Sequence, residues 1–295
     1  MGRLFPEYMD GRPACWGVST VPMPSVSTYP NITIPTLNAI MKTCGEEIYM
    51  AKQNIYDNEV FFSGYRKLRE REVNANNLFE LPTLFSLMPD LEGKKVLDLG
   101  CGGGERCMDY LSHGAASVTG IDISENMLAV ARSENSDPRI TYINLPMEDL
   151  GSLDGEFDVV ISSLALHYVE DFAGVVKNVY RLLCDGGIFL FSQEHPLSTC
   201  YSGIGDRWTR DENGKKLHVN IANYCVERRN DQTWFVEGVQ IYHRMFSTII
   251  NTLADNGFRI LKTVEPYPDE ELVKKYPEYS DLYHKPDFLF VKAGK

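Results

Sequence analysis

The sequence predicts an α/β protein whose parallel sheet is covered by helices on both faces. From Lys95 onward, short runs rich in β-branched residues alternate with helical windows, which is the pattern of consecutive βαβ units. The first of these runs leads into a glycine-rich turn that opens a helix. The chain has 295 residues, of which 43% are hydrophobic and 24% are charged, as expected for a globular protein with a large core.

The part of the chain before the sheet is predicted to form two segments. Residues 1–38 hold six of the fifteen prolines, which are excluded from helix interiors, so we expect an irregular N-terminal extension. Residues 39–92 are expected to form an N-terminal helical lid, because apolar residues recur at helical spacing over 39–73 and again over 77–88. Residues 93–295 then form the main domain.

The first part of the main domain contains five predicted strands and three predicted helices. The strands are VLDL (96–99), SVTGI (117–121), ITYI (140–143), FDVVIS (157–162) and GIFLFS (187–192), the last of them after a Gly-Gly turn. The helices cover 104–113, 125–133 and 171–183. Because helices separate the strands, the strands are expected to run in parallel.

The second part of the main domain breaks this alternation. Residues 197–238 are rich in aromatic and polar residues and contain the turn sequence DENG (211–214), which predicts a β-rich cap inserted over the substrate. A helix is predicted over 240–256, where Asn256-Gly257 is a helix stop signal. Two further strands are predicted over 258–266 and 287–293.

The string VLDLGCGGGE, residues 96–105, contains most of the chemical information. Its pattern is Asp-x-Gly-x-Gly-x-Gly, and glycines in a strand-to-helix turn let the backbone approach a ligand closely. Position 105 is Glu where a dinucleotide-binding fingerprint requires glycine. Asp98, before the turn, favours a positively charged ligand and repels a pyrophosphate. Asp122 ends the next strand, where an acid can accept both hydroxyls of a ribose.

These residues resemble class I S-adenosylmethionine-dependent methyltransferases, and the resemblance extends over roughly residues 60–295. It implies a Rossmann-like sheet of seven strands, one of them antiparallel, with S-adenosylmethionine (SAM) across the carboxyl ends of the first strands. Further strings resemble a bacterial subgroup that acts on small molecules. These strings are ISSLALHYVEDF (161–172), SQEHPL (192–197), YHR (242–244) and EPYP (265–268).

The resemblance implies a set of cofactor-binding residues. They are Tyr65, Arg69, Asp98, Gly100, Cys101, Gly102, Gly104, Asp122, Ile123, Met147, Glu148 and Ser163. Asp98 would face the methionine end of SAM, Asp122 the ribose, and Arg69 the methionine carboxylate. Met147 and Glu148 would frame the adenine, although Pro146 stands where many relatives have an additional Asp.

The candidate catalytic residues are His167, His195, His243 and Tyr224. His167 and His195 follow predicted strand ends, at the edge where open α/β sheets bind ligands, and histidine exchanges protons near neutral pH. Either is expected to act as a base or as a positioning residue, and a structural role is the alternative for all four. Glu194 is expected to be a solvated or orienting carboxylate. Trp208, Tyr224, Trp234 and Tyr242 would either wall a substrate pocket or pack the insertion.

The charge of the chain limits its partners. Lysine and arginine number 29 and acidic residues 41, a net charge of −12. Between Val96 and Pro196 there are 5 basic and 16 acidic residues, so −11 of that charge lies in the cofactor region, where it suits a cationic cofactor. This acidity, together with the lack of a Pro-Pro-aromatic string after the fourth strand, argues against nucleic acid.

Other sequence features argue against membranes and metals. No run of about 18 apolar residues exists to span a membrane. The seven scattered cysteines form no CxxC motif, which indicates reduced thiols and no zinc site. We therefore expect a cytoplasmic enzyme without a bound metal, which is a monomer or a homodimer.

The predicted function is SAM-dependent transfer of a methyl group to a small-molecule acceptor by in-line displacement, with a histidine as candidate base. The alternatives are a non-catalytic SAM-binding protein and an NAD(P)-dependent oxidoreductase, which Glu105 disfavours. The sequence does not distinguish oxygen, nitrogen, sulfur and carbon as the accepting atom.

Overall fold

The computed structural model describes residues 52–69, 73–201 and 205–295, with the side chain of Arg69 excepted. The chain divides into two compact units, Met1–Met50 and Ala51–Lys295, and only the second is described here. The predicted extension 1–38 and the start of the predicted lid therefore lie outside the described residues. No helix within the described ranges is long and apolar enough to cross a membrane.

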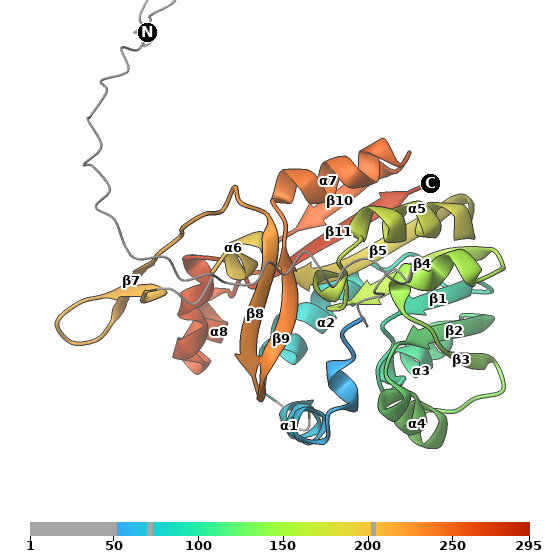
Figure 1. Ribbon diagram of the computed structural model, residues 1–295, viewed down its shortest axis with the longest axis horizontal. Coiled ribbons are helices and arrows are strands. Elements are labelled where there is room, and N and C mark those ends of the chain that lie inside the picture. The colour runs from blue at the N-terminus through green and yellow to red at the C-terminus, as the bar shows by residue number, and fades with distance from the viewer. Residues whose placement is uncertain (1–51, 70–72, 202–204) are drawn as a thin grey trace, which may run out of the picture. The chain divides into compact units, whose positions relative to one another are not determined.

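Seven strands form one sheet, in the order β10-β11-β5-β4-β1-β2-β3 (Figure 1). The strands are β1 (Lys95–Leu99), β2 (Ser117–Asp122), β3 (Ile140–Asn144), β4 (Phe157–Ser163), β5 (Leu183–Glu194), β10 (Arg259–Val264) and β11 (Phe288–Gly294). β11 pairs antiparallel with β5 and β10, and the other neighbours pair in parallel. The predicted seven-stranded, mostly parallel sheet is confirmed.

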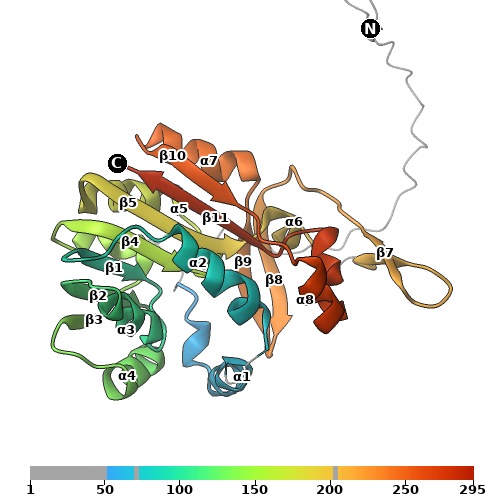
Figure 2. The ribbon, with the colours of Figure 1, turned by 180° about the vertical axis from the view of Figure 1, so that it is seen from behind.

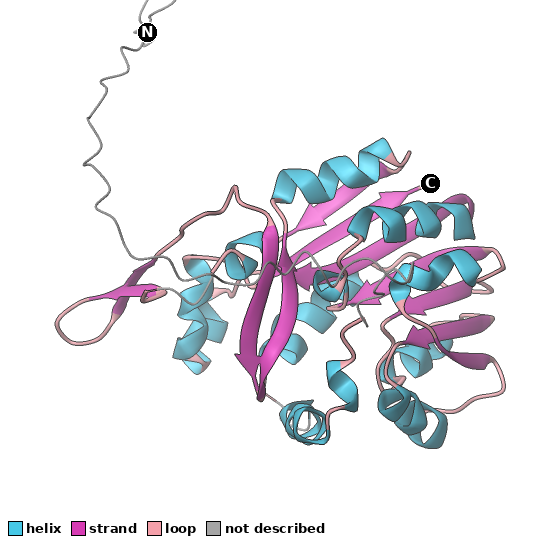
Figure 3. Ribbon diagram, in the orientation of Figure 1, coloured by secondary structure: helices cyan, strands magenta, loops and turns pink. Residues whose placement is uncertain are grey.

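Helices cover both faces of this sheet, as Figures 1, 2 and 3 show. One face carries α5 (Phe172–Leu182) and α7 (Phe246–Asp255). The other carries α2 (Leu81–Leu87), α3 (Glu105–Ser112) and α4 (Glu125–Glu134). The arrangement predicted from the alternation of strands and helices is therefore confirmed.

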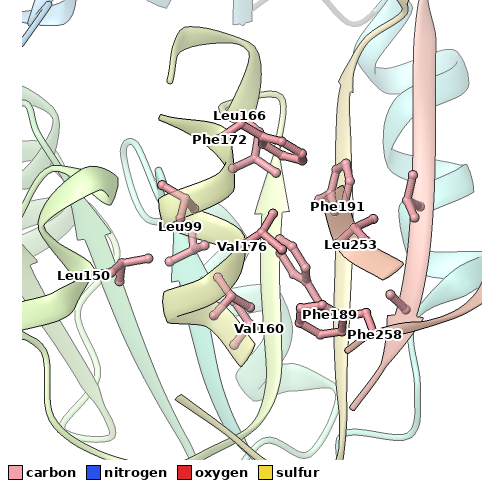
Figure 4. Close-up of a cluster of buried hydrophobic side chains, with 14 of the residues drawn as sticks. Leu99, Leu150, Val160, Leu166, Phe172, Val176, Phe189, Phe191, Leu253 and Phe258 are labelled. Atoms are coloured by element: carbon pink, nitrogen blue, oxygen red, sulfur yellow. The ribbon is translucent and has the colours of Figure 1, made fainter. Parts of the chain in front are cut away.

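The alternation of side chains along the strands explains why both faces are covered. In β1, Leu97 and Leu99 belong to the buried cluster that includes α5 and α7, part of which Figure 4 shows. Val96 points to the opposite face, where it packs in the second cluster with residues of α2 and α3. A strand buried on both faces reads as a continuous apolar run, as VLDL does.

Two local predictions are wrong. The Gly186-Gly187 pair lies within β5 rather than before it, in a bulge where the register against β4 shifts and Gly186 has a φ of 79°. Residues 240–243 belong to the strand β9 (Val236–His243), and the helix predicted from 240 begins only at Phe246. Val239, Ile241 and His243 are buried alternately, which is the period of a strand.

The insertion forms two antiparallel hairpins. β6 (Trp208–Arg210) pairs with β7 (Lys216–Val219) around the predicted DENG turn. β8 (Arg228–Trp234) pairs with β9, and this hairpin stands across the carboxyl ends of the central strands, with α1 (Glu59–Arg69) near its tip (Figures 1 and 2). The remaining helical segments are Ile55–Asp57, Asn76–Glu80, Met147–Ser152, Leu166–Tyr168, α6 (Pro196–Thr199), α8 (Glu270–Lys275) and Pro277–Tyr283.

Candidate active site

A cavity of about 420 Å³ lies at the carboxyl ends of β1, β2, β4 and β5. Its volume is in the range of pockets that hold small ligands. Part of its wall comes from the segment before and within α1 and from the β8–β9 hairpin. The predicted site residues that line the cavity are Tyr65, Asp98, Gly100, Cys101, Gly102, Asp122, Ile123, Met147, Glu148, Ser163 and His167.

The glycine turn lines the cavity, and its backbone is left-handed at Gly100 and Gly102. Gly100 has a φ of 74°, and a Cβ atom built on it would lie 2.6 Å from the Cβ of Ala165. Only glycine fits there without moving the neighbouring chain. The N–H of Gly102 donates to Oδ2 of Asp122 at 2.9 Å, so the acid at the end of β2 fixes the turn.

Gly104 has a different role from the one expected. It is the N-cap of α3 with a φ of 83°, and it does not line the cavity. A Cβ on Gly104 would lie 2.3 Å from the hydroxyl oxygen of Tyr142 and 3.0 Å from Ala131. Gly104 therefore shapes the turn from behind, where the lack of a side chain leaves room for Tyr142 and Ala131.

Two acids face the cavity from adjacent strands, the buried Asp98 and the half-buried Asp122. Asp122 accepts N–H bonds from Gly102 and Ser124, at 2.9 and 2.8 Å, and burial nevertheless raises its pKa above 3.8. Burial raises the pKa of Asp98 to about 7, against the opposing effects of the Cys107 thiol and Arg106. A carboxyl group that is half ionised at neutral pH becomes fully ionised when a cation binds beside it. These acids therefore fit a cationic ligand.

Other predicted cofactor residues occupy distinct positions around the cavity. Met147 and Glu148 line it from the short helix that follows β3. The hydroxyl of Ser163 donates to Oε1 of the buried Glu80 at 2.8 Å, which ties β4 to the segment before α2. Arg69 ends α1, and its side chain lies outside what the structure describes.

Cys101 also lines the cavity, but its thiol is not reactive. It is 6% exposed, and a hydrogen bond with Cys107 together with burial raises its pKa well above 9. A neutral, buried thiol packs as a small apolar group.

Among the four candidate catalytic residues, only His167 lines the cavity. Its Nδ1 accepts the backbone N–H of Glu194 at 3.3 Å, so the hydrogen of the neutral ring is on Nε2. Burial, with a smaller contribution from Arg244, lowers the pKa of His167 to about 3. A neutral imidazole with Nε2–H donates a hydrogen bond, so its geometry fits positioning rather than proton abstraction.

His195, the second candidate base, does not line the cavity. Its Nδ1 accepts the N–H of Leu197 at 3.1 Å, and its Nε2 pairs with Oε1 of Glu265 at 2.9 Å. Both ring nitrogens are thus engaged within the protein. The histidine caps α6, a structural role.

His243 and Tyr224 hold the base of the β8–β9 hairpin and do not line the cavity. Nε2 of His243 donates to the carbonyl of Tyr224 at 2.7 Å, and Nδ1 accepts from the hydroxyl of Thr199 at 2.9 Å. The Tyr224 hydroxyl accepts the N–H of Phe246, the first residue of α7, at 3.0 Å. These contacts fasten the insertion to α6 and α7.

Several cavity residues were not singled out as site residues by the sequence. Among them are Tyr56, Tyr168 and Glu194. Trp234 also lines the cavity, and it is the only one of the four candidate wall aromatics that does so. Tyr56 contacts the rings of Tyr65 and Tyr168 edge to face, with centroids 5.2 and 6.3 Å apart. Tyr168 directly follows His167, so its position after β4 could have identified it as a cavity residue. No sequence pattern around Tyr56 indicates that it lines the cavity.

Comparison with known proteins identifies the family. Residues 97–191 match a sequence family described as a methyltransferase domain. An S-adenosylmethionine-dependent methyltransferase from Mesorhizobium loti is 36% identical, with a TM-score of 0.67, and the match covers 76% of this chain and 99% of that one.

Two further relatives are similar over most of their length. A solved structure from Listeria monocytogenes, for which the same activity has been suggested, is 41% identical with a TM-score of 0.65, over 73% of this chain and 97% of that one. An uncharacterized protein of Haemophilus influenzae is 38% identical over 83% of this chain and 98% of its own length. With the cavity, the glycine turn and the acids described above, these similarities show that the chain belongs to the SAM-dependent methyltransferases and uses SAM as its cofactor.

Proposed function

We propose that this enzyme methylates a small molecule that binds in the same cavity as SAM. The observation that carries the proposal is that the cavity extends beyond the glycine turn to an aromatic wall. This wall consists of Tyr56, Tyr65, Tyr168 and Trp234, which we call the aromatic wall below. It borders His167 and Glu194, at the carboxyl ends of β4 and β5.

The cover of the cavity supports a small acceptor over a macromolecular one. Phe61 of α1 contacts Trp234 of the hairpin edge to face, with ring centroids 5.2 Å apart. The ring of Phe235 lies where a Cβ of Gly64 would be, at 2.6 Å. Because α1 and the hairpin pack directly on each other, the acceptor has to fit beneath them.

The residues of this chain then have separate tasks. Bound SAM supplies a methyl group that its positively charged sulfur already activates. Asp122 and the glycine turn hold the ribose side, and Asp98 compensates positive charge at the methionine end. Because Nδ1 of His167 is occupied by the Glu194 N–H, its Nε2–H can donate only to a polar atom of the acceptor other than the atom that is methylated. Holding two reactants at attack distance can supply about 7–11 kcal/mol of the barrier.

The first experiment measures cofactor binding by calorimetry with SAM, its demethylated product and NADH. We expect wild type to bind the first two and not NADH. Asp122→Asn should weaken SAM binding at least tenfold. The amide group keeps only one oxygen, so either the Gly102 turn or the ribose loses a hydrogen-bond acceptor. Glu156→Gln, an exposed acid before β4, is the matched control and should bind as wild type does.

The second experiment incubates the protein and SAM with a metabolite extract and searches by mass spectrometry for products about 14 Da heavier. Products that disappear in Asp122→Asn support the proposal. Binding of SAM without any such product would favour a non-catalytic SAM-binding protein, and binding of NADH instead of SAM would refute the proposed cofactor.

A further inference from the structure

We propose that the acceptor is an amine, which binds as an ammonium ion against Glu194 and gives its proton to that carboxylate. This inference rests on the proposed function and names the class of its substrate. It starts from the carboxylate at the end of β5, which the sequence did not connect with proton transfer.

Glu194 is held firmly by its backbone while its side chain faces the cavity. It is the last residue of β5, pairs with Phe288 of β11, and donates its N–H to His167. Its side chain is among those that line the cavity. In the part of the chain that the structure describes, neither carboxylate oxygen has a hydrogen-bond or ion-pair partner. Its geometry therefore leaves both oxygens available to a ligand.

The surroundings of Glu194 disfavour its negative charge until a cation arrives. Burial raises the pKa of Glu194, and the nearby Asp287 adds to this effect. Lys285 and Arg207 act in the opposite direction, but Lys285 pairs with Asp287, and neither cation forms an ion pair with Glu194 within the described residues. Because a buried charge needs a partner, a cationic ligand supplies what the protein does not.

The aromatic wall adds a second attraction for a cation. The faces of tyrosine and tryptophan rings attract ammonium groups through their quadrupoles. Tyr168 belongs to this wall. Burial is the main cause that raises the pKa of its hydroxyl, and the nearby charge of Glu194 raises this pKa further. Carboxylate and rings are thus neighbours in one cavity, as an ammonium site requires.

The charges around the whole cavity select against an anionic acceptor. In the described part of the chain five acids line it, namely Asp98, Glu105, Asp122, Glu148 and Glu194. The two basic residues among the described lining are already paired, Lys52 with Asp149 at 2.5 Å and Arg106 with Asp109 at 2.8 Å. A neutral alcohol would leave Glu194 without a countercharge, whereas an ammonium ion supplies one.

The transfer step balances with Glu194 as proton acceptor. An N–H bond of the ammonium ion breaks, its electron pair stays on nitrogen, and the proton passes to Oε of Glu194. The nitrogen lone pair then forms a bond to the methyl carbon, as the carbon–sulfur bond breaks and leaves its electron pair on sulfur. Glu194 releases the proton to water when the methylated amine leaves. No oxidant or reductant is involved.

The test compares amines with alcohols of the same shape. Benzylamine, phenethylamine and 3-phenylpropylamine are titrated, each beside its alcohol, into protein saturated with demethylated cofactor, and binding is measured by calorimetry at pH 8. We expect at least one amine to bind at least tenfold more tightly than its alcohol. Glu194→Gln should abolish this preference while changing SAM affinity less than twofold, and Glu156→Gln should retain it.

Methyl transfer provides a second readout on the same variants. Products formed from a metabolite extract should be N-methylated, and Glu194→Gln should slow their formation at least a hundredfold. Glu194→Asp should restore part of the rate, since it retains the base. Thermal unfolding of Glu194→Gln should match or exceed that of wild type, because the side chain makes no internal bond in the described residues that the substitution would break.

The outcomes separate this inference from the proposed function. If SAM binds and transfers its methyl group only to hydroxyl compounds, or if no amine is preferred to its alcohol, the amine assignment is overturned while the methyltransferase function stands. Retention of the amine preference by Glu194→Gln would overturn the role of Glu194. Failure to bind SAM at all would instead refute the proposed function.

Discussion

Replacing Asp98 by asparagine should make the protein more stable without cofactor and less able to bind it. Asp98 is 1% exposed in β1, and asparagine preserves its shape while it removes its charge. The Cys107 thiol, which lies 3.5 Å from Oδ2 of Asp98, still finds an oxygen acceptor in the variant. The main change is therefore electrostatic.

The size of the effect follows from the pKa of Asp98. Burial raises it from 3.8 to about 7, roughly three pH units, and each unit corresponds to about 1.4 kcal/mol. Between about pH 4 and pH 7 the folded chain holds a proton that the unfolded chain has released. The stability associated with this proton is complete below pH 4 and is lost as the pH rises through 7. At pH 8 we therefore expect Asp98→Asn to be more stable by up to about 4 kcal/mol.

Urea unfolding of the cofactor-free proteins at pH 5, 6, 7 and 8 measures this difference directly. The two proteins should converge toward pH 5 and separate toward pH 8, while SAM affinity of the variant falls at least tenfold at pH 8. An Asp98→Asn protein that is less stable than wild type at pH 8 would refute the reasoning, because the ionised carboxylate would then be net stabilising. Unchanged SAM affinity would show that Asp98 does not meet the cationic end of the cofactor.

Three further predictions concern packing, the glycine turn and acid stability. Leu253→Ala in α7 removes a fully buried side chain and should lower the free energy of unfolding by about 2–5 kcal/mol. Urea unfolding should show a lower midpoint with an unchanged m-value, and a loss under about 1 kcal/mol would contradict the packing described. Gly104→Ala should lower the free energy of unfolding by at least about 1–2 kcal/mol, because alanine is strained at a left-handed φ. It should also weaken SAM binding, because the strain displaces the glycine turn. No change in either stability or SAM affinity would contradict this. His167 takes up a proton below about pH 6.5 when unfolded but only near pH 3 when folded, so its own contribution to the free energy of unfolding should fall by on the order of 2 kcal/mol between pH 6.5 and 5, against the opposite contribution of Asp98. His167→Gln should therefore gain stability relative to wild type over this range in urea titrations, and an unchanged difference between the two proteins would count against the assignment.

The sequence predicts the sheet and the cofactor turn because their signals are local. Apolar runs define the strands, and the glycine spacing together with Asp98 and Asp122 defines the turn, which the structure places at one cavity. The start of α7 was misplaced because Ile241 and Tyr242 stand four residues before Met245 and Phe246, so the helical spacing of apolar residues runs on into the end of β9.

The acceptor side was predicted less well because it depends on tertiary contacts. Strand ends indicate the correct edge of the sheet but not the direction of each side chain. Successive side chains of an extended chain point to opposite sides, so Glu194 faces the cavity while His195, the next residue, meets Glu265. Tyr56 and Trp234 are 178 positions apart in sequence and share the cavity only because α1 meets the hairpin.

The β8–β9 hairpin also has an evolutionary consequence. The glycine turn, Asp98 and Asp122 belong to the sheet and its loops, whereas Trp234 and its neighbours lie on a ribbon that is fastened to the body through α6 and α7. If the acceptor binds against the aromatic wall as proposed, mutations within the ribbon can alter which acceptor is used without disturbing the glycine turn. A gene duplicate could therefore acquire a new substrate by drift in this one ribbon, while its ancestral cofactor chemistry is inherited intact.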